Sequence, residues 1–143
     1  MINKKSIIVS VALFLAGLSA WFLFWDNSQS EPIRGNAIVS ISVPKLPEAF
    51  LSGKKIFDTK CSSCHGENAV GAHDIGPPLV HIVYEPNHHS DGSFVLAAKN
   101  GVRSHHWPYG NMPPVDGILD TEISEIIKYV RFLQRANGIG NSK

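Results

Sequence analysis

The chain has two cysteines, Cys61 and Cys64, which stand three residues apart with His65 directly after the second. This short segment limits the fold more than any other feature, because each chemistry open to a pair of thiols needs its own surroundings. A disulfide needs an oxidising compartment. A zinc site needs further cysteine or histidine ligands at finger-like spacing, and a thioredoxin-like pair needs a strand followed by a helix. The rest of the sequence therefore decides what the segment does.

The N-terminal part indicates the compartment. Residues 7–25 carry no charge and are mostly apolar, Lys4 and Lys5 precede them, and only Arg34 follows nearby. A helix of this length spans about 28 Å, close to the ~30 Å hydrocarbon thickness of a bilayer. We predict a single-pass transmembrane anchor here, with residues 1–6 in the cytoplasm and the rest of the chain outside. A cleaved signal peptide is the alternative, and it also exports the domain.

The remaining chain has room for one domain. With 143 residues and a formal net charge of +1, it has no space for a second catalytic domain and no basic footprint for nucleic acid. Residues 26–46 are polar and punctuated by proline and glycine, which predicts a linker. Within it, residues 37–43 alternate in part and are expected to be ordered. We predict the folded domain at residues 47–137 and a flexible tail at residues 138–143.

Export alone would favour a disulfide between Cys61 and Cys64. The downstream histidines do not have the spacing of a zinc finger, and no strand–helix context surrounds the cysteines. Cys-x-x-Cys-His is instead the pattern to which a c-type haem is attached. On a helix, positions i, i+3 and i+4 share one face, so both thiols can reach one porphyrin while His65 points its imidazole at the iron.

Apolar patterning predicts three helices in the domain. Residues 50–61 have apolar side chains at three- and four-residue steps and lead into the cysteines. Gly53 in this stretch costs on the order of 1 kcal/mol, which a close helix contact would explain. A second helix is predicted at residues 93–100, and a third begins at Asp120 or Thr121. The apolar stripe of the third helix comprises Ile123, Ile126, Ile127, Val130 and Leu133.

Several motifs follow one another along the chain. Gly-Lys-Lys-Ile-Phe precedes Cys-x-x-Cys-His, and then come Gly-Pro-x-Leu, a methionine in a proline-rich loop and a closing amphipathic helix. This order resembles class I cytochrome c, of the membrane-anchored bacterial type, over about residues 47–137. The resemblance implies an all-α fold of roughly three to five helices around one covalently bound haem c. It also implies that the first and last helices cross, with Gly53 and Phe57 against Ile126 and Tyr129.

The resemblance further implies how the haem is held. Cys61 and Cys64 would form its two thioethers, and His65 would be an axial ligand of its iron. The carbonyl of Pro77 would accept the other ring N–H of His65, which fixes the angle of the imidazole. Leu79 would pack on the face of the haem.

Met112 is the expected second axial ligand. Met1 is the only other methionine, and it lies across the membrane or is removed. The two prolines after Met112 keep its loop from turning helical, so the loop could hold the sulfur at the iron. Filling a gap in the core is the alternative role for this side chain. Trp107 and Tyr109 flank the loop, and we expect at least one to line the haem crevice or bond a propionate, with ordinary loop packing as the alternative.

The other histidines are competing ligands for the iron, and a second histidine ligand would lower the reduction potential. Ordinary solvent-facing loop positions are the first interpretation; a surface copper or zinc site, or a docking patch sensitive to pH, is the alternative. The adjacent histidines of each pair are not expected to share one face. The six are His73, His81, His88, His89, His105 and His106.

Ligands on both axial positions leave no open site on iron for a substrate, so a one-electron change is what remains. We therefore expect an electron carrier and not an enzyme, on the outer, periplasmic side of the cytoplasmic membrane. It would pass electrons between a respiratory donor and a terminal oxidase, reductase or dehydrogenase. Its expected partners are redox proteins and the membrane, with no nucleic acid and no small-molecule substrate. The alternatives are a haem enzyme or a gas or peroxide sensor with a labile sixth ligand, or a permanent cytochrome subunit of a larger redox complex.

Overall fold

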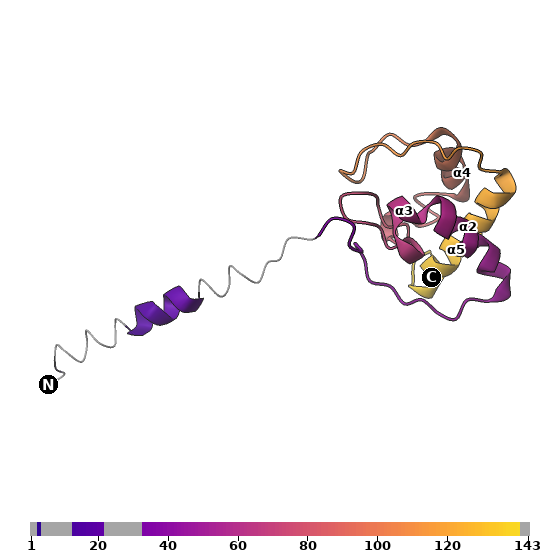
Figure 1. Cartoon of the computed structure of the whole chain (residues 1–143). Helices are drawn as coiled ribbons and strands as arrows, with labels where there is room; N and C mark the ends of the chain where they lie inside the picture. The colour runs from indigo at the N-terminus through magenta and orange to yellow at the C-terminus, as the bar shows by residue number, and fades with distance from the viewer. Residues whose placement is uncertain (1–2, 4–12, 22–32, 141–143) are drawn as a thin grey trace. The chain divides into compact units, whose positions relative to one another are not determined.

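The computed structural model describes residues 3, 13–21 and 33–140. It divides the chain into two units, Met1–Pro32 and Ile33–Lys143. In the described part of the second unit, all regular elements are helical and the β-bridges are isolated (Figure 1). In chain order they are η1 (Glu48–Phe50), α2 (Leu51–Lys60), α3 (Ser62–His65), η2 (Glu67–Ala69), η3 (Ile82–Tyr84), α4 (Asp91–Asn100) and α5 (Asp120–Ala136). The predicted all-α fold is therefore confirmed.

The first unit contains the predicted membrane anchor at residues 7–25. Residues 13–21 are helical, whereas residues 7–12 and 22–25 lie outside the described residues. Within the described part of the chain, no helix has both the length and the apolar character needed to cross a membrane. The anchor therefore stays a prediction.

Helices α2 and α5 cross in the second unit (Figure 1). At Gly53 in α2, an added Cβ would come 2.1 Å from the carbonyl oxygen of Glu125 in α5, so only glycine permits this approach. One turn further along, the Phe57 and Tyr129 rings pack with their centroids 5.7 Å apart. The implied crossing is confirmed for Gly53 and Phe57 against Tyr129, and the close approach to the Glu125 backbone explains the glycine. We call this contact around Gly53, Phe57 and Tyr129 the helix crossing.

The hydrophobic core surrounds the helix crossing. All five residues of the predicted apolar stripe of α5 are buried, and Phe50 stacks on Phe132 with ring centroids 4.5 Å apart. Full burial of such an apolar side chain stabilises the folded state by about 1.5–3 kcal/mol. Burial in the core is therefore a main source of the free energy that keeps α2 and α5 packed. The core cluster consists of Phe57, Ala69, Val80, Ile126, Tyr129, Val130 and Leu133.

Helix α4 begins at Asp91 rather than at the predicted Ser93. The prediction was wrong at this end because Gly92, a poor helix former, hides the first turn in the sequence. Ser90 has an extended backbone, with φ −62° and ψ 166°, and ends the preceding loop. Helix α5 begins at Asp120, as predicted.

The described part of the predicted linker packs against the domain. Residues 33–46 contain no strand, but the Ser42 N–H donates to Asn137 Oδ1 at 2.8 Å and Asn137 Nδ2 donates back to the Ser42 carbonyl at 2.9 Å. Ile139, in the predicted tail, packs against the core cluster. Both ends of the domain are thus fastened beside the C-terminus of α5.

Candidate haem site

A cavity of about 800 Å³ lies beside the helix crossing, and α3, α4, α5 and residues 101–115 contribute to its mostly apolar lining. Its volume is within the range of roughly 300–1,000 Å³ that is usual for ligand and cofactor sites. All of the predicted site residues border this one cavity: Cys61, Cys64, His65, Pro77, Leu79, Trp107, Tyr109 and Met112.

The attachment segment follows directly from α2. Cys61 ends α2, where its N–H donates to the Phe57 carbonyl at 2.8 Å. The single turn of α3 follows, and in it the His65 N–H donates to the Cys61 carbonyl at 3.0 Å. Cys61 and Cys64 form no disulfide with each other; Cys61 is partly buried and Cys64 is exposed. Before haem is attached, burial raises the pKa of the Cys61 thiol to about 11, although the nearby Lys60 charge opposes the rise.

His65 is buried, with 8% of its surface exposed. Its Nδ1–H donates to the Pro77 carbonyl at 2.9 Å, the acceptor that the resemblance implies. Burial lowers the pKa of the imidazole, and the bond to Pro77 offsets this in part. The ring is therefore held neutral with its tautomer fixed, and Nε2 keeps the lone pair that a metal ligand needs.

Met112 is held by a short backbone pairing. Its N–H donates to the Val102 carbonyl and the Val102 N–H donates to the Met112 carbonyl, each at 2.9 Å. Gly101 makes this pairing possible: it has a φ of +74°, and an added Cβ would come 2.5 Å from the Met112 carbonyl oxygen. The glycine after α4 thus serves both to end the helix and to bring the Met112 loop back beside it.

Trp107 contributes an unsatisfied polar atom to the site. Its Nε1 is buried and has no hydrogen-bond partner, although the side chain borders the cavity. Burial raises the pKa of the nearby Tyr84 hydroxyl and the Trp107 N–H lowers it in part, but the two groups do not form a hydrogen bond. An oxygen acceptor on a group bound in the cavity would satisfy this donor. Tyr109 stacks on Trp107, with ring centroids 6.0 Å apart.

Two polar residues of α5 support the cavity wall, and the sequence analysis missed both. Gln134 is fully buried and its Nε2 donates to the carbonyls of Leu79 at 2.8 Å and Tyr84 at 3.0 Å. Arg131 is 6% exposed and donates to the Tyr84 and His89 carbonyls. Both residues lie on the apolar side of α5. Polar residues among periodic apolar positions are unusual, and this signal in the sequence could have identified them.

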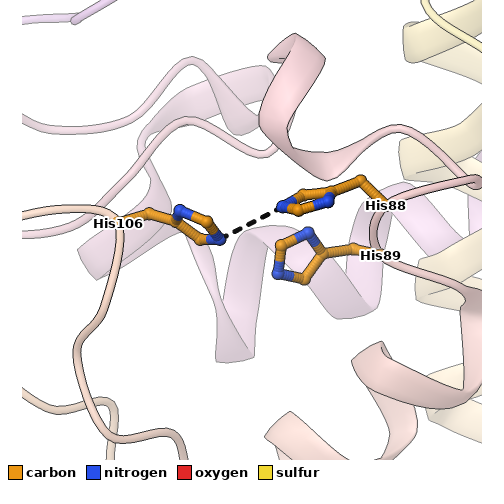
Figure 2. Close-up of side chains that lie close together, drawn as sticks. All are labelled: His88, His89 and His106. Atoms are coloured by element: carbon orange, nitrogen blue, oxygen red, sulfur yellow. Dashed lines mark hydrogen bonds between the residues drawn. The ribbon is translucent and has the colours of Figure 1, made fainter.

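Four histidines gather at the edge of the cavity: His88, His89, His105 and His106. The expectation that adjacent histidines cannot share a face is wrong, since the centroids of His88 and His89 are 4.7 Å apart and each also packs against His106 (Figure 2). The helical spacing rule does not apply, because these pairs lie in turns and loops. Desolvation and the neighbouring histidine charges lower the pKa of His106.

The remaining two histidines have other neighbours. The Nδ1 of His73 lies 3.1 Å from a carboxylate oxygen of Asp74 without forming a hydrogen bond to it. His81 accepts the Val83 N–H on its Nδ1 at 3.2 Å and packs edge-on against Trp107.

Comparison with known families gives one result that covers most of the domain. A family model for cytochrome c matches residues 50–134. The chain belongs to the cytochrome c family. Comparison with curated proteins and with solved structures found no match. Haem-based electron transfer is the chemistry of this family, and covalently attached haem c is its cofactor. Cys61 and Cys64 are present in the spacing of such an attachment site.

The residues of the cavity fit such a group. Its walls are mostly apolar, its thiols stand in the Cys-x-x-Cys-His spacing, and the free Nε2 of His65 is a suitable iron ligand. The buried donor of Trp107 fits the oxygens of a propionate. Apolar side chains of α4, including Phe94 and Leu96, complete the lining.

Proposed function

We propose that this cytochrome is a one-electron carrier whose single haem c has His65 and Met112 as axial ligands. The observation that carries the proposal is that both residues border the cavity that also contains Cys61 and Cys64. His65 offers Nε2, because its Nδ1 is occupied by the Pro77 carbonyl. Met112 offers the only thioether among the described residues.

The surroundings of these side chains favour electron transfer over substrate chemistry. When bound, haem supplies an iron that changes by one electron. With both His65 and Met112 as its protein ligands, this iron would have no position left for a substrate. Gly101 and the backbone pairing with Val102 hold Met112 from one side, and Pro113 and Pro114 restrict its loop from the other. A ligand on such a restricted loop is expected to stay on the iron when the charge changes.

We further propose that the domain works outside the cytoplasmic membrane, tethered by residues 7–25. The support is the uncharged stretch at 7–25 with Lys4 and Lys5 before it. The carrier would pass electrons between a respiratory donor and a terminal oxidase, reductase or dehydrogenase. Contacts with such partners are transient and small, below about 1,200 Å² of buried surface.

The axial ligand is tested by replacing Met112 with Ala and recording the optical spectrum of the haem-loaded protein. We expect the variant to change from low-spin to high-spin haem and to lose the sulfur-to-iron charge-transfer band. Leu96→Ala is the matched control, because it truncates another apolar side chain of the same cavity and offers no ligand atom. Leu96→Ala is expected to keep the low-spin spectrum.

A low-spin spectrum that Met112→Ala leaves unchanged would overturn the ligand assignment and point to a histidine. A wild-type spectrum that is already high-spin would instead favour a haem enzyme or a gas sensor. The two results are distinguished by the wild-type spectrum alone.

A further inference from the structure

Three histidine rings from two separate loops meet at the edge of the cavity. His88 and His89 lie in the turn before α4, and His106 lies in the loop after it. One ligand nitrogen of each lies within 4.8 Å of those of the other two (Figure 2). In the described part of the chain, this is the one group of three or more His, Cys, Asp or Glu side chains that meets this condition. The fold, and not the local sequence, brings the rings together.

The spacing of the nitrogens suits a metal ion. His88 Nε2 and His106 Nε2 are 3.4 Å apart, which is long for a hydrogen bond between two nitrogens. Two nitrogens that each lie ~2.0–2.1 Å from a tetrahedral zinc ion are about 3.3 Å apart. The ligand nitrogen of His89 lies within 4.8 Å of the other two, so side-chain rotation would be enough to bring all three onto one ion. Three such donors leave a fourth position for water.

His89 is oriented as a metal ligand usually is. Its Nδ1–H donates to the Val83 carbonyl at 2.6 Å, which fixes the tautomer and leaves Nε2 able to bind a metal. Metal-ligating histidines almost always donate the second ring N–H in this way. The His89 carbonyl in turn accepts a hydrogen bond from Arg131 of α5. The loop that carries His88 and His89 is thus anchored on the rigid helix.

The charge of Arg131 does not prevent a cation from binding nearby. Its Nε donates to the Asp91 carboxylate at 2.8 Å, so the two charges compensate each other. His88 and His106 are exposed and His89 is half-buried, which leaves the rings accessible from solvent.

We propose that His88, His89 and His106 bind a divalent transition-metal ion, Cu²⁺ or Zn²⁺. Imidazole nitrogen suits these ions, whereas Mg²⁺ and Ca²⁺ take oxygen ligands. The order of affinities for a nitrogen site puts Cu²⁺ above Zn²⁺. The proposal does not depend on which residues ligate the haem iron, because the three rings converge whether or not Met112 is a ligand.

The metal site borders the same cavity as the haem site. A bound dication would therefore favour the reduced haem, which carries one positive charge fewer. We expect Zn²⁺, which undergoes no redox change of its own, to shift the reduction potential of the haem to a more positive value.

Isothermal titration calorimetry of the haem-loaded full chain, without an affinity tag, tests the site. The probes are Zn²⁺ and Cu²⁺ as their simple salts, with Mg²⁺ as the control metal. We expect one saturable site with a dissociation constant of about 1 µM or tighter for Cu²⁺, weaker binding of Zn²⁺ and no binding of Mg²⁺. The double variant His88→Ala/His106→Ala should lose at least about tenfold in affinity. His73→Ala, which removes a histidine outside the group, should bind as the wild type does.

Each outcome has a definite consequence. Absence of saturable binding, or equal affinity in the double variant and the wild type, overturns the proposal. A change in the haem spectrum of the double variant without added metal also overturns it, because the rings would then serve the haem. His88→Gln/His106→Gln removes the same nitrogens with less loss of polar surface, and its unchanged haem spectrum together with lost metal binding supports the site.

Discussion

The two sides of the domain are built differently. At the helix crossing, Phe57 is 0% and Tyr129 1% exposed, and backbone meets backbone at Gly53. Helix α4 and residues 101–115, which we call the cavity side, border the haem cavity instead, and α4 has no buried residue. Polypeptide packing therefore accounts for the helix crossing. The apolar side chains of the cavity side need the haem as their packing partner.

Truncation of a core side chain is the strongest test of this difference between the two sides. Phe57→Ala should lower the free energy of unfolding by about 3–5 kcal/mol, because it leaves a cavity between α2 and α5. Leu96→Ala on α4 should cost less than Phe57→Ala, because Leu96 borders the haem cavity and lies outside the polypeptide core cluster. Urea unfolding of the two haem-loaded variants checks this, and equal losses would contradict the distinction between the two sides.

Two glycine substitutions, one on each side, should change the stability of the protein in opposite directions. Gly53→Ala should destabilise the protein by about 1–3 kcal/mol, because its Cβ would meet the Glu125 carbonyl at 2.1 Å and the helices must separate. Gly92→Ala in α4 meets only Ser90 Oγ, at 3.7 Å. It should stabilise the protein by up to about 1 kcal/mol through helix propensity. Thermal unfolding of both variants would refute this account if the two midpoints moved in the same direction.

Arg131 connects the two sides. Arg131→Met should cost about 1–3 kcal/mol, because the Tyr84 and His89 carbonyls lose a charged donor. The amides of the turn before α4 should also exchange with solvent faster, which hydrogen-exchange mass spectrometry measures. Lys128→Met is the control on the same helix: its exposed pair with Glu125 is expected to matter by less than about 0.5 kcal/mol. Unchanged exchange in Arg131→Met would show that the loop needs no anchor.

The smallest expected effect is at the Tyr129 hydroxyl. It donates to Asn68 Oδ1 at 3.0 Å, so Tyr129→Phe should cost about 1 kcal/mol at neutral pH. Burial, followed by the charges of Asp58 and Glu67, raises the pKa of Tyr129 to about 12. Above pH ~10 the unfolded chain releases this proton while the folded chain keeps it, so stability falls as pH rises toward about 12. Urea unfolding at several alkaline pH values should show a shallower fall in Tyr129→Phe; an identical fall would contradict the assignment.

The sequence was sufficient for the parts of the structure that depend on periodic burial. The unusual glycine of α2 predicted a close helix contact, since a small residue at a helix contact has a direct physical cause, and the resemblance to class I cytochrome c implied that the last helix makes it. The attachment spacing, together with the motif order, named the candidate attachment and ligand side chains that border the cavity: Cys61, Cys64, His65 and Met112. These features are local or repeat at helical intervals.

The convergence of the histidines, and the carbonyls to which Arg131 and Gln134 donate, could not be predicted in the same way. Both depend on how the loops before and after α4 return to α5, and loop paths are not fixed by periodicity. The helical spacing rule predicted that the adjacent His88 and His89 would not share a face, and it failed because they lie in a turn. The start of α4 was missed for a related reason, since Gly92 weakens the local signal.

The most direct test of the central claim is the optical spectrum of the wild-type protein, oxidised and then reduced, with and without carbon monoxide. Ligation by both His65 and Met112 predicts low-spin haem in both states, a sulfur-to-iron charge-transfer band in the oxidised state, and no change with carbon monoxide. A high-spin spectrum, or reduced haem that binds carbon monoxide readily, would contradict electron transfer through a fully ligated iron.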